Sequence, residues 1–207
     1  NLYVSKPIQV KGTVTIELVK GQLNENSVYY SNILRNVNYS QRRVPMITIQ
    51  SGANVTITGS GGGAIFGSDS VSTFDHINSH APLIYIEEGA RLTLKGVCIG
   101  RNNNVSVDAN SPSTGGGILN KGILATDQSS EISNCPAAYG GGLYNLGTAY
   151  LLNTTVSKCT ADISGGGIYN AQNSYFEICN DSAIRSCNVL IEIEDYFDSL
   201  YGWGGGI

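Results

Sequence analysis

A glycine-rich hexapeptide recurs at a fixed spacing in the second half of the chain. Residues 115–120 read Gly-Gly-Gly-Ile-Leu-Asn, residues 140–145 read Gly-Gly-Gly-Leu-Tyr-Asn, and residues 165–170 read Gly-Gly-Gly-Ile-Tyr-Asn. The three copies start 25 residues apart, and a fourth copy begins at Gly204. In step with them, an aliphatic residue precedes a cysteine by three positions, at Cys135, Cys159 and Cys187. Two landmarks that recur in the same order indicate an internal structural repeat.

The first half of the chain carries a related repeat with a longer spacing. Residues 45–59 align with residues 82–96 at an offset of 37, with seven identical positions. In each copy, aliphatic residues alternate with polar ones on both sides of a Gly-Ala pair. Alternation with a period of two predicts short strands, and the Gly-Ala pair predicts the corner between them.

Leucine-rich repeats have a similar length, so their pattern was compared with the sequence. They require apolar residues eight, five and three positions before a conserved Asn or Cys. The residues at those distances from Cys135 are Asp127, Ser130 and Ile132, and only the last is apolar. This class is therefore excluded. The remaining interpretation is an all-β parallel solenoid, in which each repeat of about 25 residues forms one coil and stacked coils bury a common core.

The expected domain organisation follows from where the repeat pattern is visible. Residues 1–44 fit the pattern poorly and are expected to form an N-terminal cap and a first strand. Residues 45–207 are expected to form the solenoid. Because the glycine motif starts again at Gly204, we expect the solenoid to continue beyond residue 207.

Stacked repeats place equivalent side chains in columns. Asn120, Asn145 and Asn170 are expected to form a structural ladder of hydrogen-bonded amides. A second column is predicted for the three repeat cysteines, either as buried thiols or as a disulfide between neighbouring coils, whose spacing of about 4.8 Å suits a disulfide. Cys98 joins this column if the first half is in phase with the second. The fifth cysteine is Cys179, and an odd number leaves at least one thiol without a partner in the chain.

The motif Gly-Gly-Gly-Ile-Tyr-Asn, with alternating Ser/Thr and aliphatic residues after it, resembles right-handed parallel β-helix proteins of the pectin-lyase-like superfamily. It is especially similar to the repeats of chlamydial polymorphic membrane proteins. That family pairs a Gly-Gly-Ala-Ile motif with a Phe-x-x-Asn motif, for which this chain has an aliphatic residue and a cysteine. The resemblance implies a single-stranded right-handed parallel β-helix located at the cell surface or outside the cell.

Composition and charge exclude several classes of function. The chain has 207 residues, a formal net charge of -4 and no apolar run long enough to span a bilayer, so neither nucleic-acid binding nor membrane insertion by this segment is expected. It has no Cys-x-x-Cys pair and only two histidines, so no metal site and no cofactor are predicted.

Residues with catalytic side chains were weighed against an enzymatic function. Asp75, His76 and His80 lie close together in the sequence, and Arg42 and Arg43 precede the first long repeat. Polysaccharide lyases on this fold need clustered carboxylates for calcium together with an arginine base, and that pattern is missing. We therefore expect a non-enzymatic structural or adhesion module. One form of this hypothesis makes the module part of an extracellular filament. A carbohydrate-active lyase or hydrolase on the same fold is the alternative.

Two segments of sixteen residues, 99–114 and 188–203, are predicted to leave the solenoid as long loops. Insertions in solenoids often form the binding face. The second loop combines acidic and aromatic residues, and the expected contact residues for other protein chains or surface glycans are Tyr196, Phe197, Tyr201 and Trp203. Self-association along the rod axis is a further expectation. Glycosylation sequons occur at Asn38, Asn54, Asn104, Asn153 and Asn180.

Overall fold

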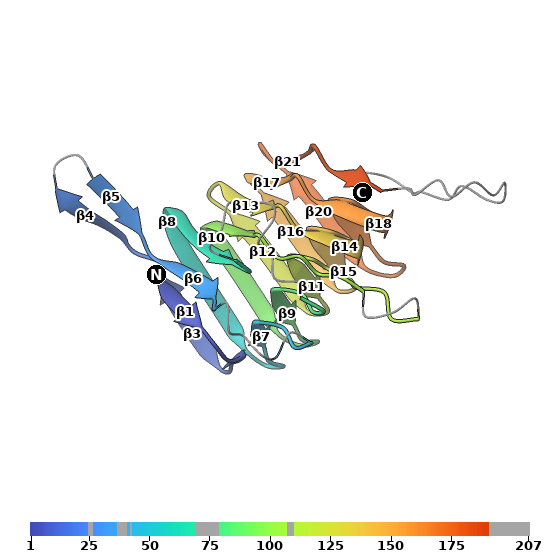
Figure 1. Ribbon diagram of the computed structural model, residues 1–207, viewed down its shortest axis with the longest axis horizontal. Helices are drawn as coiled ribbons and strands as arrows, with labels where there is room; N and C mark the ends of the chain where they lie inside the picture. Colours follow the sequence, from blue (N-terminus) through green and yellow to red (C-terminus); the bar gives the residue numbers. More distant parts are fainter. Residues whose placement is uncertain (25–26, 37–40, 42, 69–78, 107–109, 191–207) are drawn as a thin grey trace.

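A computed structural model describes residues 1–24, 27–36, 41, 43–68, 79–106 and 110–190. All regular elements in these ranges are β-strands, and no helix occurs among them. Most strands pair in parallel, so the described chain is all-β with parallel strands in stacked sheets, an arrangement compatible with a β-helix. Figure 1 shows the repeats side by side, from blue at the N-terminal end to orange at the other.

One face is a six-stranded parallel sheet built from the glycine motifs and their counterparts in the first half. Its order is β19-β15-β11-β9-β7-β2. The strands are β2 (Ile8–Val10), β7 (Ile47–Ile49), β9 (Ile84–Ile86), β11 (Ile118–Asn120), β15 (Leu143–Asn145) and β19 (Ile168–Asn170). Ile47 pairs with Ile84, which is the offset of 37 that the sequence predicts. Each later repeat adds one strand in the same register.

A second, eleven-stranded sheet has two rows of parallel strands joined by the long strands β8 and β10. The first row comprises β3 (Thr13–Glu17), the start of β8 (Asn54–Phe66), the start of β10 (Arg91–Gly100), β12 (Ile123–Asp127), β16 (Thr148–Leu152) and β20 (Tyr175–Cys179). The second row comprises β1 (Leu2–Val4), β6 (Asn32–Arg35), the ends of β8 and β10, β13 (Ser130–Ser133), β17 (Thr154–Ser157) and β21 (Ala183–Arg185).

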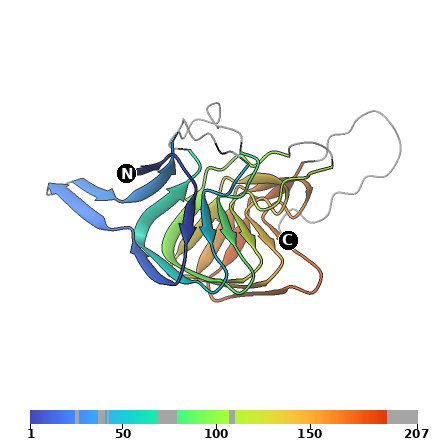
Figure 2. The same ribbon diagram turned by 90° about the horizontal axis from the view of Figure 1, so that it is seen from below.

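Two smaller sheets complete the fold. A three-stranded parallel sheet contains β14 (Pro136–Tyr139), β18 (Thr160–Ser164) and β22 (Asn188–Val189). An antiparallel hairpin of β4 (Lys20–Asn24) and β5 (Ser27–Tyr30) projects from the N-terminal end (Figure 2). The strands β2 and β3 pair with β7 and β8, so parallel sheet strands lie on both sides of the domain boundary expected at residue 45.

The core lies between the sheets and is built from the alternating aliphatic residues. Ile49, Ile57, Ile86 and Leu94 are fully buried, and so are Ile118, Leu143 and Leu151 in later repeats. In the last described repeat the equivalent residue, Ile178, is 39% exposed. No described segment is a helix with the length and apolar character that a bilayer crossing requires.

The glycine triplets are required by the close approach of successive repeats. Gly115, Gly140 and Gly165 have φ values of 62°, 59° and 65°, a conformation that side chains disfavour. The next glycine of the first two triplets, Gly116 or Gly141, faces backbone instead. A Cβ on Gly141 would lie 2.5 Å from the Gly166 carbonyl oxygen. The triplet therefore combines a turn with a contact that excludes any side chain.

Candidate functional site

The asparagine column lies inside the corner that follows the six-stranded sheet. Asn120, Asn145 and Asn170 occupy paired register positions. Asn120 Nδ2 donates to Asn145 Oδ1 at 2.7 Å, and Asn145 Nδ2 donates to Asn170 Oδ1 at 2.7 Å. The same nitrogens also donate to the carbonyls of Thr148 and Tyr175. The column thus closes the corner and is structural, because its amides are used within the protein.

The cysteine column occupies another corner, between the second row and the three-stranded sheet. Cys135 and Cys159 are fully buried, whereas Cys187 in the last repeat is half-buried. All five cysteines are free thiols in this structure. Hydrogen bonding with Cys135 and burial raise the pKa of the Cys159 thiol. The pKa of Cys187 is likewise raised, by hydrogen bonding with Cys159 and by burial.

Cys98 does not belong to this column, so the condition under which it would join, a first half in phase with the second, is not met at this position. Cys98 pairs with Glu131, whereas Ile99 pairs with Ile132, the residue three before Cys135. The column position is therefore taken by Asn102, which is 1% exposed. An irregularity in β10 between residues 95 and 97 moves Cys98 to the half-buried outer side. There burial, and then the charge of Glu131, raise its pKa to about 11.

Asn102 makes the column polar at this level. It accepts a hydrogen bond from Nη1 of the buried Arg35 at 2.9 Å. Its own Nδ2 donates to the carbonyls of Ala81 and Gly116, at 3.1 and 2.6 Å. The 99–114 segment is thereby tied to the repeats on both sides.

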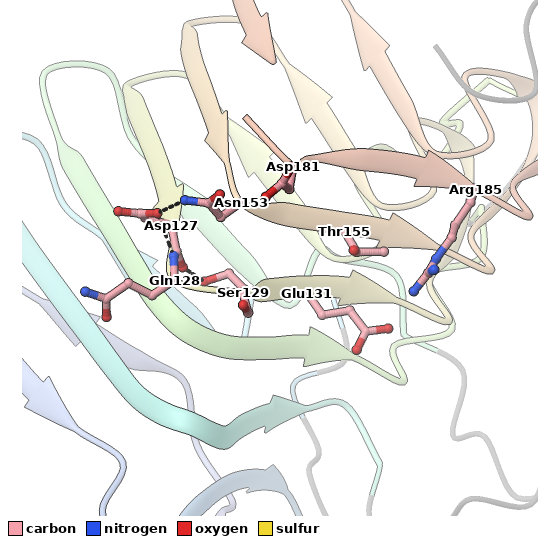
Figure 3. Close-up of a pocket in the computed structure, with 9 residues that line it drawn as sticks. Asp127, Gln128, Ser129, Glu131, Asn153, Thr155, Asp181 and Arg185 are labelled. Atoms are coloured by element: carbon pink, nitrogen blue, oxygen red, sulfur yellow. Dashed lines mark hydrogen bonds between the residues drawn. The ribbon is translucent and has the colours of Figure 1, made fainter. Parts of the chain in front are cut away.

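A polar groove with a cavity volume of about 500 Å³ crosses the corner between the two rows of the eleven-stranded sheet. Three successive repeats contribute to it. Figure 3 shows Asp127, Asn153 and Asp181 toward one end and Glu131 and Arg185 toward the other. The remaining lining residues are Gln128, Ser129, Ser130 and Thr155. Sequence reasoning missed this groove, although a polar Asp or Asn does recur between the strands of each repeat.

Two carboxylates of the groove are held by hydrogen bonds. Asp127 Oδ1 accepts from Asn153 Nδ2 at 2.9 Å and from the Gln128 amide at 2.7 Å. These two bonds, the Asn153 bond first, lower the pKa of Asp127. Glu131 Oε1 accepts from the Ser157 hydroxyl at 3.1 Å. Three carboxylates and one guanidinium give the groove a negative balance that favours hydroxyl-rich or cationic ligands.

The outer face of the six-stranded sheet carries a column of tyrosines. Tyr144 and Tyr169 stack with ring centroids 4.9 Å apart and an interplanar angle of 7°. Tyr139 packs against both with its ring nearly perpendicular. Burial and the two neighbouring tyrosines raise the pKa of Tyr144. Because the rings cover one another, the cluster mainly reinforces the stacking of repeats.

The five sequons differ in their surroundings. Asn54 and Asn180 are exposed, and Asn153 donates its amide nitrogen to Asp127. Asn104 is only 2% exposed, and its Nδ2 donates to the carbonyls of Thr114 and Gly115. The folded chain therefore has no room for a glycan at Asn104. Asn38 lies outside the described residues.

The residues weighed for catalysis are mostly not placed by the structure. His80 lies with Nδ1 3.0 Å from the Val105 carbonyl oxygen. Asp75, His76 and Arg42 lie outside the described residues, as do all four residues of the expected contact loop: Tyr196, Phe197, Tyr201 and Trp203. Within the described ranges, no three His, Cys, Asp or Glu side chains are arranged to hold a metal ion.

Comparison with known proteins adds no relative to this picture. No protein-family model matches the chain, no curated protein matches it, and no solved structure matches it.

Proposed function

We propose that the chain is a right-handed parallel β-helix similar to those of the pectin-lyase-like superfamily, with one coil in each repeat. The support is the register: strands of successive repeats pair in parallel in three sheets, and in the two larger ones residues of similar type pair with one another. The spacing of 25 residues between the glycine motifs holds for β11, β15 and β19. In this proposal, residues 1–44 act as cap and first strand, and residues 45–207 form the β-helix.

We infer that the module is a structural or adhesion element outside the cell or at its surface, binding other protein chains or surface glycans. The observation that carries this proposal is the polar groove, in which three repeats present hydrogen-bonding side chains at one corner. Asp181 and Arg185 come from the exposed side of the last described repeat. A site formed by stacked repeats is rigid, which limits the ordering cost of binding.

A carbohydrate-active enzyme is the second candidate, because the groove combines three carboxylates with Arg185. The lowered pKa of Asp127 keeps this group ionised at neutral pH, which suits a base or a cation ligand and disfavours a general acid. Adhesion has more support than catalysis. Asp127 and Glu131 each accept a hydrogen bond from a neighbouring side chain, so both carboxylates are fixed in place by the protein and are less available for proton transfer.

Binding to an array of immobilised neutral, acidic and amino-sugar glycans separates these functions. We expect retention on a subset of glycans that Asp181→Asn and Arg185→Gln each weaken about tenfold, the effect of one lost charge-assisted hydrogen bond. Arg91→Gln is the matched control, because Arg91 is exposed on β10 away from the groove. Equal loss in the control, or no retention on any glycan, contradicts glycan adhesion.

Turnover is measured in parallel on acidic polysaccharides with and without calcium, as the absorbance of unsaturated uronides and as new reducing ends. The adhesion proposal expects neither signal above the Asp127→Asn variant. Turnover that Asp127→Asn abolishes replaces the adhesion proposal by the enzymatic one.

Self-association along the stacking axis is the remaining part of the proposal. It is supported by the strands of the last described repeat, where β19, β20, β21 and β22 each pair on one side among the described residues. Light scattering over a concentration series tests it. A mass that stays that of one chain at every concentration contradicts it.

A further inference from the structure

The three repeat cysteines are held in register on both sides. The aliphatic residues three positions before them pair with one another across β13, β17 and β21. The residues directly after them pair across β14, β18 and β22. Neighbouring Cα atoms of Cys135, Cys159 and Cys187 are therefore about one strand spacing apart, roughly 4.8 Å. This spacing lies inside the range of about 4.4–6.8 Å that disulfides tolerate.

The backbone has the same conformation at each of these cysteines. The preceding residues, Asn134, Lys158 and Ser186, have φ values of 53°, 54° and 53°. The Cys159 carbonyl accepts from the Asn188 amide at 3.1 Å, and the Cys135 carbonyl accepts from the following repeat in the same way. Successive cysteine side chains therefore leave the backbone in the same direction.

Cys159 is the middle member of the column, because its repeat pairs with the repeat of Cys135 on one side and with the repeat of Cys187 on the other. One sulfur can form only one disulfide, so Cys159 must pair with one neighbour and leave the other as a thiol. Exposure decides between them, because Cys135 is fully buried and Cys187 is half-buried. An oxidant from solvent meets Cys187 first.

We propose that Cys159 and Cys187 form a disulfide that covalently joins the last two described repeats, while Cys135 stays a buried thiol. The strands that this bond secures are the short β21 and β22. They pair with β17 and β18 and are the outermost described strands of their sheets. The inference is independent of any binding by the groove.

The oxidant is a small disulfide of the glutathione class. The Cys187 thiol loses its proton to solvent, and its sulfur attacks one sulfur of the oxidant. The oxidant's S–S bond breaks, and one small thiolate leaves and takes up a proton. The Cys159 thiol then loses its proton to solvent, and its thiolate attacks the Cys187 sulfur; the second small thiolate leaves and takes up a proton. Two protein thiols are thereby oxidised to one disulfide, and one small disulfide is reduced to two thiols.

The raised pKa values of both thiols set the conditions for this exchange. Only the thiolate attacks, so the reaction is slow at neutral pH and accelerates about tenfold per pH unit below the pKa. The experiment treats the reduced full chain with oxidised glutathione at about pH 8.5, blocks free thiols with iodoacetamide and digests with trypsin without reduction.

The tryptic fragments distinguish the pairs. Cleavage after Lys121, Lys158 and Arg185 gives fragments 122–158, 159–185 and 186–207, which carry Cys135, Cys159 with Cys179, and Cys187. We expect fragments 159–185 and 186–207 to be linked. The link persists in Cys179→Ser, whose side chain lies on the outer face of β20, and disappears in Cys159→Ala.

Three results overturn the proposal: a link that survives in Cys159→Ala, a main product joining fragments 122–158 and 159–185, or thiols that remain reduced or only glutathionylated. Hydrogen exchange provides a second measurement on the wild-type chain. Amides of residues 183–189 should exchange several-fold more slowly after oxidation. If mass spectrometry verifies the disulfide and the hydrogen-exchange rates of these amides do not change, the disulfide does not stabilise β21 and β22 as proposed.

Discussion

Asn120 donates a hydrogen bond of 2.7 Å to Asn145, although 25 residues separate them in the sequence. The same contact recurs between Asn145 and Asn170. Asn145 is therefore both acceptor and donor at full burial. A corner whose backbone groups bond to one amide in each repeat depends on every member of the column.

Replacing the central member tests this dependence. Asn145→Ala removes the acceptor for Asn120 and the donor to Asn170 and to the Tyr175 carbonyl. We expect a loss of about 2–4 kcal/mol in the free energy of unfolding, measured by urea denaturation, because buried polar groups lose their partners. The exposed Asn54→Ala serves as control and should change stability by less than about 0.5 kcal/mol. If both variants lower the free energy of unfolding by the same amount, the hydrogen bonds of the asparagine column do not stabilise the fold.

The sequence predicts the repeats well where one motif marks one strand. The glycine triplet and its Asn give the positions and register of β11, β15 and β19, because backbone contact allows no insertion between neighbouring motifs. The sequence left open whether Cys98 joins the cysteine column, because the phase of the repeat depends on the backbone of β10. Gly96 adopts φ 63° beside the irregularity there, and nothing in a cysteine pattern reveals it.

The groove could not be predicted because it depends on turns that have no shared sequence. Gln128, Ser129 and Asn153 adopt positive φ values at corresponding corners, yet only the asparagine is a residue type that favours this conformation. These turns direct side chains of different types into the same groove. Strand periodicity carries no information about such corners.

Gly141 tests the requirement for close approach between repeats. Gly141→Ala places a Cβ 2.5 Å from the Gly166 carbonyl oxygen and 2.6 Å from the Cys135 carbonyl oxygen. Backbone cannot move aside cheaply, so we expect a loss of about 3 kcal/mol or more in thermal or urea denaturation. Gly52→Ala is the control, since its φ of 77° is strained but no atom lies within 4 Å. It should cost only about 1–2 kcal/mol. A larger loss of stability in Gly52→Ala than in Gly141→Ala contradicts the argument that a side chain at Gly141 clashes with the next repeat.

Asp127 provides a test by pH. The amide of Asn153 is the main cause of its lowered pKa, so Asn153→Gly, which keeps the positive φ without strain, should raise that pKa toward its ordinary value. A lowered folded-state pKa stabilises the protein above the unfolded pKa, near 3.9, and this contribution is lost as pH falls through the folded value. The carboxyl carbon shift in an NMR titration reports the change. An identical midpoint in the variant contradicts the assignment of the Asn153 bond as the main cause of the lowered pKa.

The Thr126 and Thr154 hydroxyls, 2.8 Å apart and each 1% exposed, allow the direction of a hydrogen bond to be tested. Thr154 Oγ1 donates to the Leu152 carbonyl at 2.6 Å, so it must accept from Thr126. Thr154→Val then leaves the buried Thr126 hydroxyl without an acceptor and should cost about 2 kcal/mol. Thr126→Val leaves the Thr154 donor satisfied and should cost about 1 kcal/mol. The double variant should cost less than the sum by about 1 kcal/mol, since both hydroxyls are gone. Strict additivity in urea denaturation means that the two hydroxyls do not bond to each other.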